Sequence, residues 1–235
     1  MTGRIAGMAV AMWALWGCGL GVAGNGVIKD EAREVASFEA VRVGAGIEAD
    51  VALGQGTSVI VRTDENLLPL ITTEVKEGVL VVGTKAPGVA GTQNVRVFVV
   101  TPRLTAADSS GGAQVTAAAS VAPDFTATAS GGAKLSVCGI DSDRVVANSS
   151  GGATVSLCGK TRELVATASG GAGLLADGLT AESVHLDGSG GAHGVVLATT
   201  QVTGELSGGA SFRLLGGPAT NGVALSGGAV LTERP

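Results

Sequence analysis

The chain has no tyrosine, only six aromatic residues among 235, and a charged fraction of just 15%. A conventional globular core relies on large aromatic and aliphatic side chains, so this shortage argues against one. The 15 basic residues are outnumbered by 20 acidic ones and form no cluster, which excludes a nucleic-acid-binding surface. The 45% of hydrophobic residues excludes intrinsic disorder.

Residues 1–18 predict an export signal rather than a membrane span. Arg4 precedes an apolar run from Ile5 to Trp16, about a dozen residues, where a span needs about 20. The run ends at Leu15-Trp16-Gly17-Cys18, which resembles a bacterial lipobox and would make Cys18 the lipidated residue, although Trp16 departs from that pattern. An ordinary secretory signal or an uncleaved anchor is the alternative.

Residues 19–27 are rich in glycine and predict a flexible tether. Within them, Gly19, Gly21 and Gly24 match the spacing of a dinucleotide-binding motif. Such a motif needs a strand before it and a helix after it, and the sequence offers neither. We therefore expect no cofactor here.

Glycine is abundant, with 39 residues, and it recurs in a regular pattern. The tetrapeptide Ser-Gly-Gly-Ala occurs seven times at intervals of 18 to 20 residues, beginning at Ser110, Ser130, Ser150, Ser169, Ser189, Ser207 and Ser226. In residues 125–129 and 133–137, on either side of one copy, apolar and polar residues alternate with the period of a strand. Repeats this short and strand-like indicate a solenoid.

We therefore predict an all-β fold, a single-stranded parallel β-helix that is right-handed and has coils of about 18–20 residues. Residues 105–235 would form the regular part. Residues 28–104, which keep the same pattern of strand-like segments and glycine bends, would form an irregular cap. Small side chains would fill a narrow tube, and Gly-Gly would supply positive φ or close backbone contact at each bend. The repeat serines are expected to hydrogen-bond the bends and to stack into a ladder.

Two features of residues 28–104 carry more specific expectations. Gly44-Ala45-Gly46-Ile47 reads as a degenerate copy of the repeat bend. Residues 64–71 predict a short helix with Asp64 as its N-cap, limited by Pro69. Residues 79–82 and 95–100 predict strands.

The sequence resembles the auto-transporter adhesin head GIN domain family. The resemblance rests on residues 38–41, on Gly44-Ala45-Gly46-Ile47, on Asp64-Glu65-Asn66-Leu67-Leu68-Pro69 and on residues 74–80, followed by the serine- and glycine-rich repeats. It implies a β-helical domain at the bacterial surface or in the envelope, often on lipoproteins, and it brings no catalytic residues.

Cys138 and Cys158 are 20 residues apart and each follows its repeat serine by eight positions. They would therefore occupy equivalent positions in neighbouring coils, about 5 Å apart, within reach of a disulfide. Two reduced side chains packed side by side are the alternative. Two thiols alone lack the further ligands of a structural zinc site, so no metal is expected.

The strongest enzymatic candidate is the set His185, Asp187 and Glu205. Asp187 and Glu205 each stand two residues before a repeat serine, so they would stack in adjacent coils about 5 Å apart, a separation that suits a retaining glycosidase. A solvated face on which charge varies freely between coils is the simpler interpretation.

These observations predict a non-catalytic, exported envelope protein with a structural or adhesive role. Its partners would be a glycan or a surface protein, together with the membrane through a lipid anchor. The alternatives are a carbohydrate-active enzyme built on the β-helix and a scaffold that assembles end to end.

Overall fold

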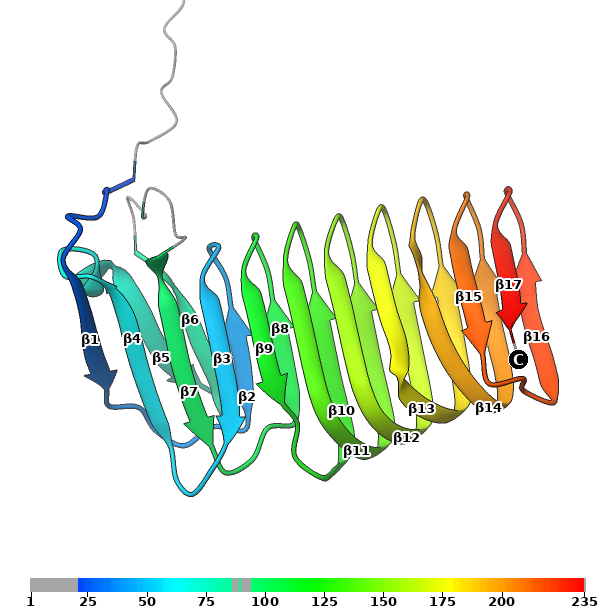
Figure 1. The fold of residues 1–235 in the computed structure, drawn as a ribbon, viewed down its shortest axis with the longest axis horizontal. Coiled ribbons are helices and arrows are strands. Elements are labelled where there is room, and N and C mark those ends of the chain that lie inside the picture. Colours follow the sequence, from blue (N-terminus) through cyan, green and yellow to red (C-terminus); the bar gives the residue numbers. More distant parts are fainter. Residues whose placement is uncertain (1–20, 86–88, 90–93, 235) are drawn as a thin grey trace, which may run out of the picture.

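The structure, a computed structural model, describes residues 21–85, 89 and 94–234, which form an elongated all-β molecule (Figure 1). The predicted signal, residues 1–18 with Cys18, lies outside this part of the chain. Among the residues described, no helix is long and apolar enough to cross a bilayer.

The C-terminal part is a parallel β-solenoid, as the repeat predicts. It contains β8 (Ala106–Ser109), β9 (Gln114–Ala118), β10 (Ala122–Ala129), β11 (Lys134–Ser149), β12 (Thr154–Ala168), β13 (Gly173–Gly188), β14 (His193–Leu206), β15 (Ser211–Leu215), β16 (Thr220–Leu225) and β17 (Val230–Arg234). Each of the long strands β11–β14 runs from one bend to the next and pairs in parallel with its neighbour. Pairing continues around the lower corner in Figure 1, so one period forms one long bent strand rather than two short ones.

The Ser-Gly-Gly-Ala bends line the upper edge of the solenoid in Figure 1. The first glycine of every copy has a positive φ, between +59° and +72°. A Cβ on Gly151 would lie 3.1 Å from the carbonyl oxygen of Gly131 in the coil before it, and Gly152 N donates to that oxygen at 2.7 Å. Glycine is therefore required here both by the backbone angle and by the close stacking of coils.

The degenerate bend at residues 44–47 is confirmed. Ile47 N donates to Gly44 O at 3.3 Å, as Ala113 N does to Ser110 O, and Ala45 takes a φ of +59° where the repeats have glycine. The next bend stacks directly upon it, since Ser110 N donates to Val43 O at 2.9 Å.

The repeat serines hydrogen-bond the bends and stack in a ladder, as predicted, but they do so with their backbones: Ala153 N, for example, donates to Ser150 O at 3.3 Å. Their backbones form the ladder, for example Ser150 N to Ala129 O at 3.0 Å. The hydroxyls that bond the bends belong to Ser109 and Ser149, one residue earlier, which donate to Ala113 O and Ala153 O at 3.1 Å. Ser109 and Ser149 are buried and reach across the bend from inside, whereas the repeat serines lie at the edge.

The space between the two sheets is filled by alanine, valine and leucine, as the narrow tube predicts. Phe125 and Phe212 are bulkier members of this core, with 1% and 2% of their surfaces exposed. The surroundings of Phe212 show how so large a ring is accommodated. Its ring fits because Gly188 and Gly194 face it: a Cβ on either residue would come within 2.9 Å of a ring carbon.

The N-terminal cap is irregular, as predicted, because it combines parallel coil strands with antiparallel pairs. Its elements are β1 (Ile28–Arg33), β2 (Ala40–Val43), β3 (Glu48–Leu53), β4 (Ser58–Asp64), the 3₁₀ helix η1 (Leu68–Leu70), β5 (Ile71–Lys76), β6 (Val79–Thr84) and β7 (Arg96–Thr101). β1 pairs with β4, β4 with β7, and β5 with β6, all antiparallel. The β5–β6 reversal needs only Glu77 and Gly78, both with positive φ, as tight hairpins do. β2 and β3 form a solenoid-like coil that pairs in parallel with β8 and β9 on one side. On the other side they pair in parallel with β6 and β7, so the parallel stacking continues into the cap.

Asp64 does not cap a helix. The short η1 helix has no side-chain cap, and the buried Asp64 carboxylate instead accepts a hydrogen bond from Gly26 N. Asn66 accepts from Asn25 N at 3.0 Å and donates to Ala23 O at 2.8 Å. Residues 23–27, expected to belong to a flexible tether, are therefore held against the cap.

Candidate functional sites

His185, Asp187 and Glu205 come together on the outer face of β13 and β14, as their spacing predicts. Asp187 stands opposite Glu205 in the ladder. His185 Nε2 lies 3.2 Å from Asp187 Oδ2, and Glu205 N donates to Asp187 Oδ1 at 3.1 Å. His185 Nδ1 lies 3.2 Å from the Thr203 hydroxyl.

The surroundings of this cluster favour a surface role. Nearly half of the His185 and Asp187 side chains is exposed, and the adjoining hollow of about 340 Å³ is open. Both oxygens of Asp187 already have partners within the chain. General acid–base chemistry gains from a water-excluded site, which this open position does not provide. Among the residues that the structure describes, no group of three or more His, Cys, Asp or Glu could hold a metal ion.

Cys138 and Cys158 stack in adjacent coils, with their Cα atoms 4.6 Å apart and their sulfurs joined as a disulfide. Cys138 is exposed and Cys158 is half-buried. The bond lies just before the corner of the coil, where the register between β11 and β12 shifts after Val137. It ties together two coils at the place where their ladder is irregular.

A second polar surface lies at that corner and was missed in the sequence. Asp141 pairs with Lys160 at 3.1 Å, Asp143 with Arg162 at 2.9 Å, and Glu163 with Arg144 at 3.2 Å. The hydrogen bond from Arg162 holds the pKa of Asp143 below its usual value. The Asp141–Lys160 and Asp143–Arg162 pairs line a hollow of about 570 Å³. Their partners stand 19 residues apart, so opposite charges at the repeat period were the available signal.

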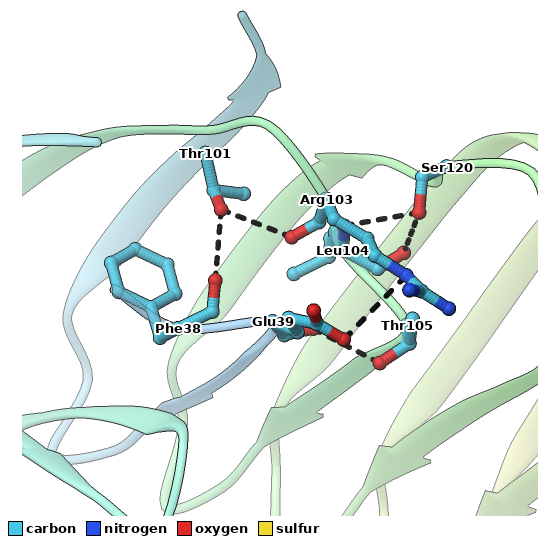
Figure 2. Close-up of polar contacts among 7 residues, drawn as sticks. All are labelled: Phe38, Glu39, Thr101, Arg103, Leu104, Thr105 and Ser120. Atoms are coloured by element: carbon cyan, nitrogen blue, oxygen red, sulfur yellow. Dashed lines mark hydrogen bonds and ion pairs between the residues drawn. The ribbon is translucent and has the colours of Figure 1, made fainter. Parts of the chain in front are cut away.

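The junction between cap and solenoid is a third polar site, shown in Figure 2. The buried Thr101 hydroxyl lies 3.0 Å from both Phe38 O and Arg103 O. The Thr105 hydroxyl donates to Glu39 O, and the Ser120 hydroxyl donates to Leu104 O and accepts from Leu104 N. These contacts join three distant segments and border a hollow of about 490 Å³. They serve the fold, because each satisfies backbone groups where the strands end.

Comparison with known families identifies the family of this chain. Residues 37–218 match the family described as "Putative auto-transporter adhesin, head GIN domain". This chain belongs to that GIN domain family. The match includes β2 to β15, so both the coil of the cap and most of the repeat region are family features.

Solved structures show the same fold. A putative adhesin from Bacteroides fragilis NCTC 9343 superposes with a TM-score of 0.84 at 16% identity, covering 91% of this chain and 100% of that chain. A putative lipid binding protein from Parabacteroides distasonis ATCC 8503 superposes with a TM-score of 0.71 at 14% sequence identity. A putative adhesin from Parabacteroides merdae ATCC 43184 superposes with a TM-score of 0.70 at 20% identity. Each match covers 91% of this chain and 99% of the other chain. No curated protein matches the chain.

Proposed function

We propose that this GIN domain protein is a non-catalytic, exported protein of the bacterial cell envelope whose solenoid binds a glycan or a surface protein. Membership of the adhesin head family is the observation that carries the proposal. The chemistry of the outer face supports it, because the polar side chains there are largely paired with one another in open hollows. A rigid face of this kind suits binding better than turnover.

The lipid anchor at Cys18 belongs to the same proposal. Ala23, the fifth residue after Cys18, is already hydrogen-bonded to Asn66 of the cap. Five extended residues span at most about 17 Å, so an anchored protein would hold its N-terminal cap close to the membrane. Cys18→Ser should move the protein from the membrane fraction to the soluble fraction of cells. Unchanged fractionation would contradict lipidation.

The binding role is tested with the purified protein on a glycan array and on a panel of polysaccharides assayed for released reducing ends. We expect binding without product. Product release that Asp187→Ala abolishes would overturn the proposal in favour of the carbohydrate-active enzyme. Asp143→Ala, which also removes an exposed, ion-paired carboxylate, is the matched control.

End-to-end assembly is the second alternative to a binding role. The edge strand β1 carries Lys29, Asp30, Glu31 and Arg33 among its six residues, and charged edges oppose the addition of further strands. We therefore expect sedimentation at increasing concentration to show no growing polymer, whereas polymers would favour the scaffold.

A further inference from the structure

A hollow of about 520 Å³ lies on the outer face of the solenoid near its C-terminal end, away from the sites described above. Its walls come from β13, β14, β15 and β17, which lie side by side in Figure 1. The side chains that matter are Leu175, His193, Val195, Arg213, Thr232 and Arg234.

Three nitrogen-bearing side chains follow a diagonal across this hollow. His193 stands opposite Ser211, Arg213 opposite Thr232, and Arg234 opposite Leu215. Each member is thus one strand over and two residues along from the one before, a diagonal of about 7–8 Å that long side chains bridge. Gly173 leaves the imidazole room, since a Cβ there would lie 3.4 Å from His193 Nε2.

The two arginines of this diagonal differ from the others in the described residues because neither contacts a carboxylate. Seven arginines form ion pairs: Arg33, Arg42, Arg62, Arg96, Arg103, Arg144 and Arg162. No acidic residue lines the hollow. Glu233, next to Arg234, stands on the inner face opposite Leu214 and accepts a hydrogen bond from Asn221. Two guanidinium groups therefore share an open hollow without a counter-charge, on a chain of net charge −5.

We propose that this hollow binds the acidic group of a polysaccharide, a carboxylate or a sulfate. Guanidinium groups bind such oxygens with charge-assisted, often bidentate hydrogen bonds. Ser211 and Thr232 add hydroxyls for the sugar's own hydroxyl groups. Leu175, 39% exposed, offers an apolar surface on which the C–H face of a sugar ring can pack, with the largely buried Val195 beside it in the lining. This inference rests on the proposed binding function and names its ligand class.

Recognition by charge also fits what the outer surface offers. The large hydrophobic side chains exposed in the described part of the chain are all aliphatic, so they provide no aromatic platform for stacking a neutral sugar. An anionic membrane would need a broad basic surface, whereas this site is one diagonal of three residues on an acidic protein. A saccharide that carries separate acid groups is the better match.

The test is calorimetric binding of the purified protein to polygalacturonate, to heparin oligosaccharides and to neutral dextran, with phosphatidylserine vesicles as a fourth probe. We expect binding to at least one acidic saccharide and to neither dextran nor vesicles. Arg213→Gln and Arg234→Gln should each weaken that binding about tenfold. Arg96→Gln, which removes an exposed but paired arginine of the cap, should leave it unchanged.

The outcomes separate this inference from the proposed function. Binding that survives Arg213→Gln together with Arg234→Gln, or binding to vesicles or dextran alone, overturns the acidic-saccharide site and leaves a binding protein. Absence of binding to both acidic saccharides also overturns it. Turnover of a polysaccharide would instead overturn the proposed function itself. Circular dichroism of each variant checks that the fold is retained.

Discussion

The cap and the repeat solenoid continue the same sheets but are held together differently. The cap adds antiparallel pairs, such as β1–β4 and the β5–β6 hairpin, to its parallel strands. Its outermost strand β1 is exposed and bears ion pairs such as Asp30–Arg62 and Lys29–Glu65. The solenoid stacks coil on coil in parallel, so closely that several glycines could not carry a Cβ without meeting backbone atoms. The cap therefore depends on turns and side-chain pairs, and the solenoid depends on backbone contact.

Gly194→Ala should cause the largest loss of stability, and it tests the role of backbone contact in the solenoid. A Cβ at 194 would lie 2.0 Å from Leu174 O and 2.9 Å from the Phe212 ring. Such overpacking should lower the free energy of unfolding by more than about 3 kcal/mol, as measured by urea denaturation. Gly56→Ala in the cap is the control, because Gly56 has a φ of +91° but a Cβ there would have no atom within 4 Å. We expect it to lower the free energy of unfolding by only about 1–2 kcal/mol. Equal losses would show that contact between coils does not set the cost.

Removing the disulfide should have the next largest effect. Cys138 and Cys158 close a loop with a sequence separation of 20, and opening a loop of that size costs about 3 kcal/mol in the chain-entropy account. Cys138→Ala together with Cys158→Ala should lower the urea midpoint by a corresponding amount. Thiol titration of the unreduced, denatured solenoid should find close to no free thiol, and two free thiols would contradict the bond.

Thr101→Val tests the connection between the two regions. The buried hydroxyl satisfies carbonyls of the cap and of the linker into the solenoid (Figure 2), and losing it should cost about 1–2 kcal/mol. Hydrogen exchange should accelerate around residues 38–39 and 103–105. Thr105→Val removes a hydroxyl that water can replace and should cost less than about 0.5 kcal/mol. A larger loss of stability from Thr105→Val than from Thr101→Val would contradict the conclusion that the buried Thr101 hydroxyl holds the junction together.

Acid should weaken both regions slightly through their ion pairs. Hydrogen bonds from Arg62 and Arg162 hold the pKa values of Asp30 and Asp143 below their usual range. Because these pKa values are lower in the folded state, the pairs stabilise it at neutral pH, and that contribution is lost as the pH falls below about 4. The effect is small because the pairs are exposed. Arg62→Gln and Arg162→Gln should each reduce the difference between urea midpoints at pH 6 and pH 3, and an unchanged difference in both would contradict the assignment.

The solenoid could be predicted from sequence because its repeat states both the period and the inward face. Once residues about twenty apart are taken as neighbours, the stacking of Cys138 on Cys158 and of Asp187 on Glu205 follows. The antiparallel pairs of the cap could not be predicted in the same way, because alternation of apolar and polar residues is identical in parallel and antiparallel strands.

The missed site features depend on contacts or register that a single sequence does not state. Asp64 binds Gly26 through the tertiary fold, 38 residues away, so its local position before an apolar run misleadingly indicated a helix cap. The diagonal of His193, Arg213 and Arg234 requires the strand register across coils of unequal length. Because the coil lengths differ, no single repeat period applied to the sequence brings these three residues into line.

The unequal coil lengths have a consequence for how this fold can change. Register shifts fall away from the glycine bends, between Val137 and Ile140, between Ser156 and Cys158, and between Ala176 and Thr180. The bends themselves stay aligned from coil to coil. Insertions, deletions or grafted peptides should accordingly be tolerated along the corner edge and rejected along the glycine edge, so variety among such proteins should accumulate on one long side of the molecule only.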